Sequence, residues 1–298
     1  MAICTEKHFT ASDGQRIGYF DEGQGQPIIF LNGWRGGDYR RIQPLVDVFQ
    51  NKYRCIGFDY RGYGFSPTTG DITLQLAARD AKELIEYLGV DNLILFGISM
   101  GGAVLYSYVQ QFGCEHCRGF VIADIPPKTL NDDTWNLGLY QGCYKNEHLQ
   151  RDLEMMLHSH TFAEFGLYFC ARVITPHYPD TPHIHCKMDP IIEQQAREIA
   201  RFWHFDETMA PMMRYANREY WVSLFTNDFR EVIPLIAVPT LLIFPDPGSI
   251  YSVKAGEWLH SQIKDSKLVI PRGTAIGTHA AILDPVVDEA FISEYFGI

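Results

Sequence analysis

A serine between two glycines directly follows a short apolar run, and this arrangement constrains the fold more than any other feature of the chain. The apolar run is Leu93-Ile-Leu-Phe96, the glycines enclose the serine in Gly97-Ile-Ser-Met-Gly101, and Ala103-Val-Leu-Tyr-Ser-Tyr-Val109 follows with no glycine or proline. Such a pattern predicts a buried strand, a sharp turn and a helix. Ser99 is therefore expected at the turn between strand and helix.

A turn of this kind holds a hydroxyl where it can act as a nucleophile. The serine stands above the strand end, and the unpaired N–H groups at the start of the helix can bind an oxyanion. Gly97 and Gly101 each lie two residues from Ser99, where a β-carbon would collide in so tight a turn. Because glycine-rich turns also occur at strand ends without any catalytic role, other parts of the chain must decide between a nucleophile and a turn residue.

Apolar runs and helical stretches alternate along the chain, which predicts an α/β fold with a mainly parallel sheet covered by helices. Residues 7–10 and 16–20 surround Ser12-Asp-Gly14 and predict an antiparallel hairpin at one edge of that sheet. The apolar runs that predict the remaining strands are residues 28–31, 54–58, 93–96, 119–123, 240–244 and 267–270.

This alternation is interrupted between residues 126 and 234, where amphipathic stretches at 147–157, 161–173 and 189–202 replace the buried strands. We therefore expect an inserted helical cap over residues 128–234, between core segments 1–127 and 235–298. The cap is rich in aromatic residues, which suggests a bulky or aromatic substrate group, although at most half of them are expected to contact it. They are Trp135, Tyr140, Phe162, Phe165, Tyr168, Phe169, Trp203, Phe205 and Trp221.

The charge balance favours a small-molecule substrate. The chain has 36 acidic and 25 basic residues, a formal net charge of −11, and no run of Lys or Arg. Nucleic acids and anionic membranes are therefore not expected as partners. A homodimer remains open.

We expect a cytoplasmic protein that needs no metal and no cofactor. No apolar run approaches the roughly 20 residues of a membrane span, and the first residues lack the apolar core of a signal peptide. Seven scattered cysteines indicate free thiols in a reducing compartment. The pairs Cys114-Glu-His-Cys117 and His183-Ile-His-Cys186 lack a second pair at a spacing suited to zinc.

Two backbone N–H groups are candidates for an oxyanion hole. Asn32-Gly-Trp-Arg-Gly-Gly37 follows the predicted strand at 28–31, and the N–H of Trp34 in this turn can join that of Met100 after the serine. The Trp34 indole is expected to line the pocket, with packing at the turn as the alternative. For the turn at Arg61-Gly-Tyr-Gly-Phe-Ser-Pro67 we expect a structural role.

His279 is the candidate general base. A serine hydroxyl needs a base to remove its proton. Of the 11 histidines, only His279 follows the last predicted strand, in a glycine-rich loop over residues 272–281. That position is expected to face Ser99.

Asp124 and Asp246 compete for the role of the carboxylate that orients the histidine. Asp124 follows the predicted strand at 119–123, and Asp246 follows the one at 240–244. The Asp246 turn, Phe244-Pro-Asp-Pro-Gly-Ser-Ile-Tyr251, is stiffened by proline on both sides and has no further carboxylate. We favour Asp124, while helix capping or turn hydrogen bonding remains an alternative for either residue.

With Gly97-Ile-Ser-Met-Gly101, Asn32-Gly-Trp34 and a late His279, the chain resembles the α/β-hydrolase family over nearly its whole length. The order Ser, Asp, His and the segments at 59–67 and 238–242 also resemble the family. The closest likeness is to cofactor-free haloperoxidase-like esterases with a helical cap. This resemblance implies that Ser99 is the nucleophile of an esterase or lactonase, that His279 is its base, and that Trp34 and Met100 donate to the oxyanion.

Two departures from the family pattern concern the turn that carries Trp34 and the position of the acid. Asn32-Gly33 replaces the more frequent His-Gly, and Gly248 stands where many members carry the acid. Some members, zearalenone-lactone hydrolases among them, keep the acid after the strand that follows the nucleophile, and residues 123–133 look similar to their segment. The resemblance therefore also favours Asp124.

Two other classes of function remain open. Cofactor-independent quinolone 2,4-dioxygenases share the fold, a Gly-Trp turn and a Thr-His pair like Thr278-His279, and in that reading His279 and Asp124 would deprotonate a hydroxylated heteroaromatic ring. Those enzymes have histidine after the serine, where this chain has Met100. The fold also serves non-catalytic binders, which would not need an alignable Ser99 and His279.

Overall fold

Within the described residues, eight strands form one sheet in the order β1-β2-β4-β3-β5-β6-β7-β8. The computed structural model describes residues 7–34, 42–158, 166–167, 169–171, 190–202, 211–246, 250–272 and 284–298. The strands are β1 Lys7–Thr10, β2 Arg16–Gly23, β3 Gln26–Leu31, β4 Tyr53–Phe58, β5 Leu93–Ile98, β6 Cys117–Ala123, β7 Thr240–Ile243 and β8 Ser266–Val269.

The pairing of these strands confirms a mostly parallel sheet with an antiparallel edge. Strand β2 pairs antiparallel with β1 and β4. All the other neighbouring pairs, from β4–β3 to β7–β8, are parallel. Every predicted strand is present, with bounds that differ by one or two residues at most places.

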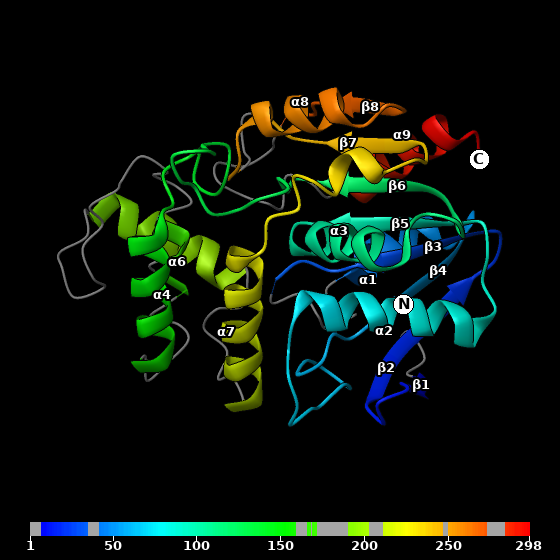
Figure 1. Cartoon of the computed structure of the whole chain (residues 1–298), viewed down its shortest axis with the longest axis horizontal. Helices are drawn as coiled ribbons and strands as arrows, with labels where there is room; N and C mark the ends of the chain where they lie inside the picture. Colours follow the sequence, from blue (N-terminus) through cyan, green and yellow to red (C-terminus); the bar gives the residue numbers. More distant parts are fainter. Residues whose placement is uncertain are drawn as a thin grey trace.

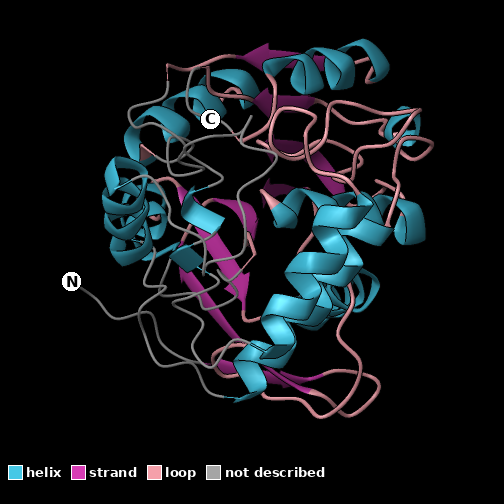
Figure 2. Ribbon diagram, turned by 90° about the vertical axis from the view of Figure 1, so that its left-hand side faces the viewer, coloured by secondary structure: helices cyan, strands magenta, loops and turns pink. Residues whose placement is uncertain are grey.

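Helices cover both faces of the sheet, and the alternation of side chains along β3 shows why. Ile29 and Leu31 belong to the core cluster shared with α2, α3 and α8, whereas Ile28 and Phe30 pack in the cluster with α1 and α9. Because both faces are buried, the central strands are apolar throughout. Figure 2 shows the twisted sheet with helices to either side. These helices are α1 Gln43–Phe49, α2 Leu74–Leu88, α3 Met100–Phe112, α8 Val253–Gln262 and α9 Pro285–Phe296.

Local sequence signals set the ends of the best-defined helix, α2. The hydroxyl of Thr73 accepts a hydrogen bond from the Leu76 N–H at 3.1 Å, and Gly89 ends the helix in the left-handed conformation. Threonine is a favoured N-cap residue, and glycine adopts positive φ without steric cost. None of the helices in the described ranges has the length and apolar character that crossing a bilayer requires.

Between β6 and β7 the described residues include the helices α4 Asn146–His158, α6 Pro190–Phe202 and α7 Pro211–Thr226, and a short 3₁₀ turn at Ile233–Leu235. In Figure 1 the three helices lie beyond the carboxyl ends of the parallel strands. Helices α4 and α6 confirm two of the predicted amphipathic stretches. The third, at 161–173, is only partly described, and the boundaries 128 and 234 of a separate cap remain a prediction.

Helix α7 is not among the predicted elements. Its buried face combines aromatic residues such as Tyr220 and Trp221 with the small or polar residues Ala216, Asn217 and Ser223. Polar residues on the buried face weaken the apolar periodicity by which a helix is recognised in a sequence.

Candidate active site

Four neighbouring strands end in one row, and this row brings the predicted site residues together. Leu31 of β3 lies opposite Gly97, Ile98 of β5 lies opposite Ala123, and Ala123 of β6 lies opposite Ile243. The residues that follow these positions therefore meet at the carboxyl edge of the sheet, where ligands bind in open parallel sheets. Gly33, Ser99 and Asp124 all lie in this row.

Ser99 occupies a strained turn between β5 and α3. Its backbone has φ 51° and ψ −124°, a conformation uncommon for residues other than glycine. The Ser99 N–H donates to the Ala123 carbonyl oxygen at 2.9 Å, and the Ser99 carbonyl oxygen accepts from the Gly102 N–H at 2.8 Å. Although serine often caps helices, its side chain makes no capping hydrogen bond to the described first turn of α3.

The two flanking glycines are required by close backbone contacts, as the sequence predicts. A β-carbon at Gly97 would lie 2.6 Å from the Gly102 Cα atom. A β-carbon at Gly101 would overlap the carbonyl oxygen of Leu31 at the end of β3. The turn therefore packs against both its own helix and the neighbouring strand, and larger residues at these positions would open it.

The turn after β3 lies against the Ser99 side chain. A β-carbon built on Gly33 would be 3.4 Å from the Ser99 Cβ and 3.9 Å from its Oγ. Met100 is the first residue of α3, so its N–H belongs to the helix N-terminus. These positions suit the proposed oxyanion donors, Trp34 and Met100, whose role remains a prediction.

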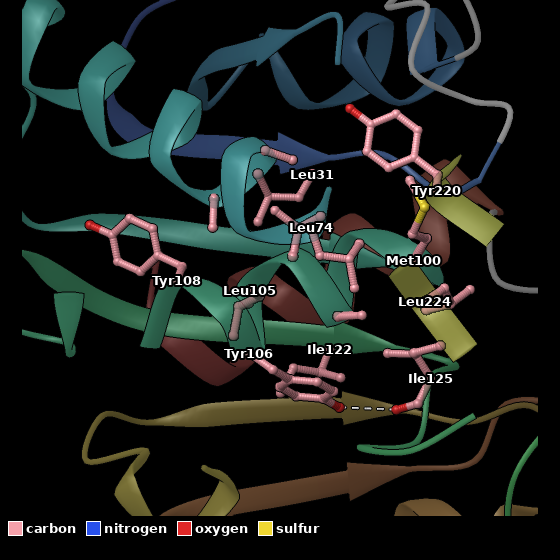
Figure 3. Close-up of a cluster of buried hydrophobic side chains, with 14 of the residues drawn as sticks. Leu31, Leu74, Met100, Leu105, Tyr106, Tyr108, Ile122, Ile125, Tyr220 and Leu224 are labelled. Atoms are coloured by element: carbon pink, nitrogen blue, oxygen red, sulfur yellow. Dashed lines mark hydrogen bonds between the residues drawn. The ribbon is translucent and has the colours of Figure 1, made fainter. Parts of the chain in front are cut away.

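The side chain of Trp34 packs against α7, and that of Met100 is buried in the core. The Trp34 indole N–H donates to the Asn217 carbonyl oxygen at 2.9 Å, and the Trp34 ring lies 4.4 Å from the Trp221 ring and 5.7 Å from that of Phe169, between centroids. Met100 is fully buried in the cluster that also holds Tyr220 of α7 (Figure 3). The Trp34 indole therefore packs on α7 while staying partly exposed, and its role in lining the pocket stays a prediction.

Asp124 is fully buried at the end of β6. Its backbone has φ 51°, and its N–H donates to the Ile243 carbonyl oxygen at 2.9 Å. The next residue, Ile125, accepts a hydrogen bond from the Tyr106 hydroxyl of α3 at 3.0 Å, the dashed line in Figure 3. Burial raises the pKa of Tyr251 well above its usual value, and the nearby Asp124 charge raises it further. The Asp124 carboxylate is thus held inside the protein beside the serine turn.

Asp246, the competing carboxylate, has a different environment. It lies three residues beyond the end of β7, its side chain is exposed, and its N–H donates to the Pro271 carbonyl oxygen at 3.0 Å. An exposed carboxylate orients a histidine poorly, because solvent competes for the same hydrogen bond. The geometry favours Asp124 for this role.

His279, the predicted base, lies outside the described residues. The preceding strand, β8, pairs with β7 so that Val269 lies opposite Ile243, at the same edge of the sheet as Ser99. Other histidines have partners elsewhere: His8 contacts Arg16, His116 contacts Asp91, His260 contacts Ser266, and His148 accepts from the Lys145 N–H. His279 therefore remains the candidate base as a prediction.

The turn at residues 59–67 has the structural role expected of it. Arg61 donates from Nε and a terminal nitrogen to both carboxylate oxygens of the buried Asp80 on α2, at 2.8 and 2.7 Å, and from its other terminal nitrogen to Asp13 at 2.6 Å. Burial lowers the pKa of Arg61, but these hydrogen bonds outweigh it and the pKa rises. Arg61 thereby ties the hairpin of β1 and β2 to α2.

Of the cysteine pair Cys114 and Cys117, Cys117 is buried in the apolar core and Cys114 packs against that core half-buried. Burial raises the pKa of Cys117 to about 12 and also raises that of Cys114, which opposes the thiolate form that binds metals. The part of the chain that the structure describes contains no group of three or more His, Cys, Asp or Glu side chains arranged to hold a metal ion. His183 and Cys186 lie outside that part.

Comparison with known proteins identifies the family. The family model described as alpha/beta hydrolase fold matches residues 26–270. The chain belongs to the α/β hydrolase fold family, as the strand order and the serine turn also indicate.

Several curated relatives are non-heme haloperoxidases. It is 36% identical to the non-heme chloroperoxidase CPO-A1 of Kitasatospora aureofaciens over 45% of this chain and 47% of that protein. It is 28% identical to a putative non-heme chloroperoxidase of Synechocystis sp. over 91% of this chain and 93% of that protein. It is also 23% identical to 3-oxoadipate enol-lactonase 1 of Acinetobacter baylyi, over 80% and 77% of the two chains. The first match spans about half the relative's length, and the other two span most of it.

Solved structures support the same fold. An esterase from Exiguobacterium antarcticum superposes with a TM-score of 0.76 at 20% identity, covering 99% of this chain and 100% of that one. At this identity the likeness concerns the fold alone.

Proposed function

We propose that this protein is a serine hydrolase that cleaves a carboxylic ester or lactone of a small molecule through an acyl-enzyme on Ser99. The observation that carries the proposal is the backbone of Ser99, held at positive φ between β5 and α3 beside the Gly33-Trp34 turn. Strained turns of this kind are kept where function requires them. The enol-lactonase relative supports a lactone as one substrate class.

In the proposed mechanism, the substrate carbonyl carbon lies near Ser99 Oγ and its oxygen near the N–H groups of Trp34 and Met100. His279 takes the hydroxyl proton as Oγ forms a bond to the carbonyl carbon, and the resulting oxyanion accepts hydrogen bonds from the two N–H groups. When the intermediate collapses, the C–O bond to the alcohol breaks and His279 returns the proton to the leaving oxygen. Water, deprotonated by the same histidine, then releases the acid from Ser99.

Asp124 has a supporting role in this mechanism. A buried carboxylate that accepts a hydrogen bond from the imidazole fixes its tautomer and stabilises its protonated form. The β5–β6 register and the hydrogen bond from Ser99 N–H to Ala123 keep Asp124 on the strand next to the nucleophile.

A bulky or aromatic substrate group remains part of the proposal. Four of the nine aromatic residues named for the cap, Trp135, Tyr140, Phe169 and Trp221, are described, and all four are buried. Burial suits a packing role for these four, and the expectation that at most half of the nine contact the substrate stays a prediction. The remaining five lie outside the described residues.

The first test is turnover of an activated p-nitrophenyl ester and of an aromatic lactone, with oxygen uptake recorded in parallel. Ser99→Ala is expected to lower kcat by about 10⁶-fold, because the nucleophile is lost. Ester turnover that survives in the folded Ser99→Ala variant would contradict the proposal. Oxygen consumption with hydroxyquinolones that is retained in that variant would instead favour the dioxygenase alternative.

A further inference from the structure

Helix α7 contacts the side chain of Trp34, whose N–H group is one of the two proposed oxyanion donors. Trp34 donates its indole N–H to the Asn217 carbonyl oxygen, and its ring packs on Trp221. Asn217 and Trp221 are four residues apart, so they occupy the same face of the helix, one turn from each other. On the other side of the serine turn, Met100 shares its buried cluster with Tyr220 and Leu224 (Figure 3).

Asn217 is itself fixed by a second, independent hydrogen bond. Its side-chain oxygen accepts from the Tyr63 hydroxyl at 2.6 Å, and the Tyr63 ring stacks on that of Tyr220 with centroids 5.6 Å apart. Asn217 is fully buried. Because Tyr63 lies in the 59–67 turn, which Arg61 ties to Asp80 on α2, the residue whose carbonyl group receives the Trp34 indole is anchored to the core.

Close contacts on either side of Asn217 fix the position of α7 on the core. A β-carbon on Gly62 would lie 2.5 Å from the Cβ of Ala216, the neighbour of Asn217. The Leu74 N–H donates to the Ser223 hydroxyl at 3.0 Å, and the Thr129 hydroxyl donates to the Leu224 carbonyl oxygen at 2.8 Å. Helix α7 is thus docked on the core along its length.

We propose that α7 positions the oxyanion hole, with Asn217 as the positioning residue that sets the backbone of Trp34 through the indole hydrogen bond. This inference rests on the proposed function. A shift of the Trp34 N–H has little effect on binding of a neutral ester, whose carbonyl oxygen carries only partial charge. It weakens the hydrogen bond to the full negative charge of the tetrahedral intermediate, so it acts on the transition state.

The test is the Trp34→Phe variant, which keeps an aromatic ring against Trp221 and removes the indole N–H. We expect kcat for an activated ester to fall by about 10-fold while KM changes less than about threefold, since a displaced donor is less damaging than a lost one. Affinity for a trifluoromethyl ketone, which forms an oxyanion on the serine, is expected to fall by the same factor as kcat. A merely stabilising contact would not lower this affinity in proportion to kcat.

Two further variants make the test decisive. Tyr63→Phe removes the bond to the Asn217 side chain at a distance from Ser99 and is expected to lower kcat by about threefold with KM unchanged. If Trp34→Phe fails to fold, the Tyr63→Phe variant alone tests whether α7 positions the oxyanion hole. Ser223→Ala removes an equally buried bond between α7 and the core, away from the Trp34 turn, and is the matched control. Its kcat is expected to stay within about twofold of the parent.

The outcomes separate this inference from the proposed function. Wild-type protein that hydrolyses the ester, together with unchanged kcat and ketone affinity in the folded Trp34→Phe and Tyr63→Phe variants, would overturn the inference alone. Equal losses in all three variants would also overturn it, because they would indicate general destabilisation. Wild-type protein that neither hydrolyses esters nor binds the ketone would refute the proposed function and this inference with it.

Discussion

The aspartates that follow β6 and β7 differ in burial and in their distance from the strand end, although the two strands are paired neighbours. Asp124 directly follows the last residue of β6, turns inward with a positive φ and is fully buried. Asp246 follows β7 only after Phe244 and Pro245 and is exposed. Aspartate tolerates the left-handed region better than most residues, which permits the inward turn at Asp124.

This difference shows which two properties favour one aspartate as the acid. They are a position directly at the strand end next to Ser99 and burial of the side chain. Ser99 donates its N–H to the residue just before Asp124, so the two residues cannot separate without breaking the β5–β6 pairing. No corresponding bond ties Asp246 to the serine turn among the described residues. The comparison therefore makes separable predictions for the carboxylates.

Replacing Asp124 is expected to have the largest effect. Asp124→Asn keeps the size of the side chain but holds the imidazole in the wrong tautomer, so kcat/KM for an activated ester is expected to fall by about 10⁴-fold. The measurement is steady-state kinetics on folded protein. A loss smaller than about 10-fold would mean that Asp124 is not the acid.

Asp288 is a third aspartate for this comparison. Like Asp124 it is buried, but it lies on α9 and not at a strand end of the candidate site. Burial, with a smaller contribution from the neighbouring Asp284, raises its pKa to about 8, and its Oδ2 has no hydrogen-bond partner among the described residues. The folded protein thus retains a proton that the unfolded chain releases above about pH 4. The contribution of Asp288 to stability is therefore greatest below that pH and is lost as the pH rises toward 8.

Asp288→Asn is expected to remove this part of the pH dependence. At pH 9 the variant should be more stable than the parent by on the order of a few kcal/mol, while its ester turnover at pH 7 stays within about twofold. Urea unfolding at pH 5, 7 and 9 measures the first quantity. Identical pH dependence in both proteins would show that Asp288 is ionised in the folded state.

Asp246→Asn is expected to have the smallest effect. The side chain is exposed, so kcat/KM should stay within about twofold and the free energy of unfolding within about 0.5 kcal/mol. The same kinetic assay and a denaturant titration measure both values. A loss in kcat/KM greater than that of Asp124→Asn would reverse the assignment of the acid.

Much of the fold could be predicted because its central strands are buried on both faces. Runs such as 93–96 and 119–123 are apolar throughout, and each ends in a turn that the sequence marks clearly. Helix α7 could not be predicted, because Asn217 and Ser223 on its buried face form specific hydrogen bonds that an apolar pattern does not reveal. Such contacts depend on residues more than 140 positions away in the chain.

The candidate site divides in a similar way. Ser99 and its glycines could be predicted because the turn imposes local steric demands that only certain residues satisfy. The preference for Asp124 over Asp246 also came from the sequence, but the burial of Asp124 that supports it depends on the neighbouring strands and cannot be read from the sequence. The packing of Trp34 on α7 was likewise hidden, since a tryptophan in a glycine-rich turn suits a pocket wall and a packing contact equally well.

The most direct test of the account is labelling with a fluorophosphonate probe, followed by peptide mass spectrometry to find the modified residue. We expect modification at Ser99 in the parent protein and in Asp246→Asn, strongly slowed modification in Asp124→Asn, and none in His279→Ala. This result would establish an activated serine served by the histidine and the buried aspartate. Folded parent protein that stays unlabelled, or that is labelled at another residue, would contradict the central claim that Ser99 is the nucleophile.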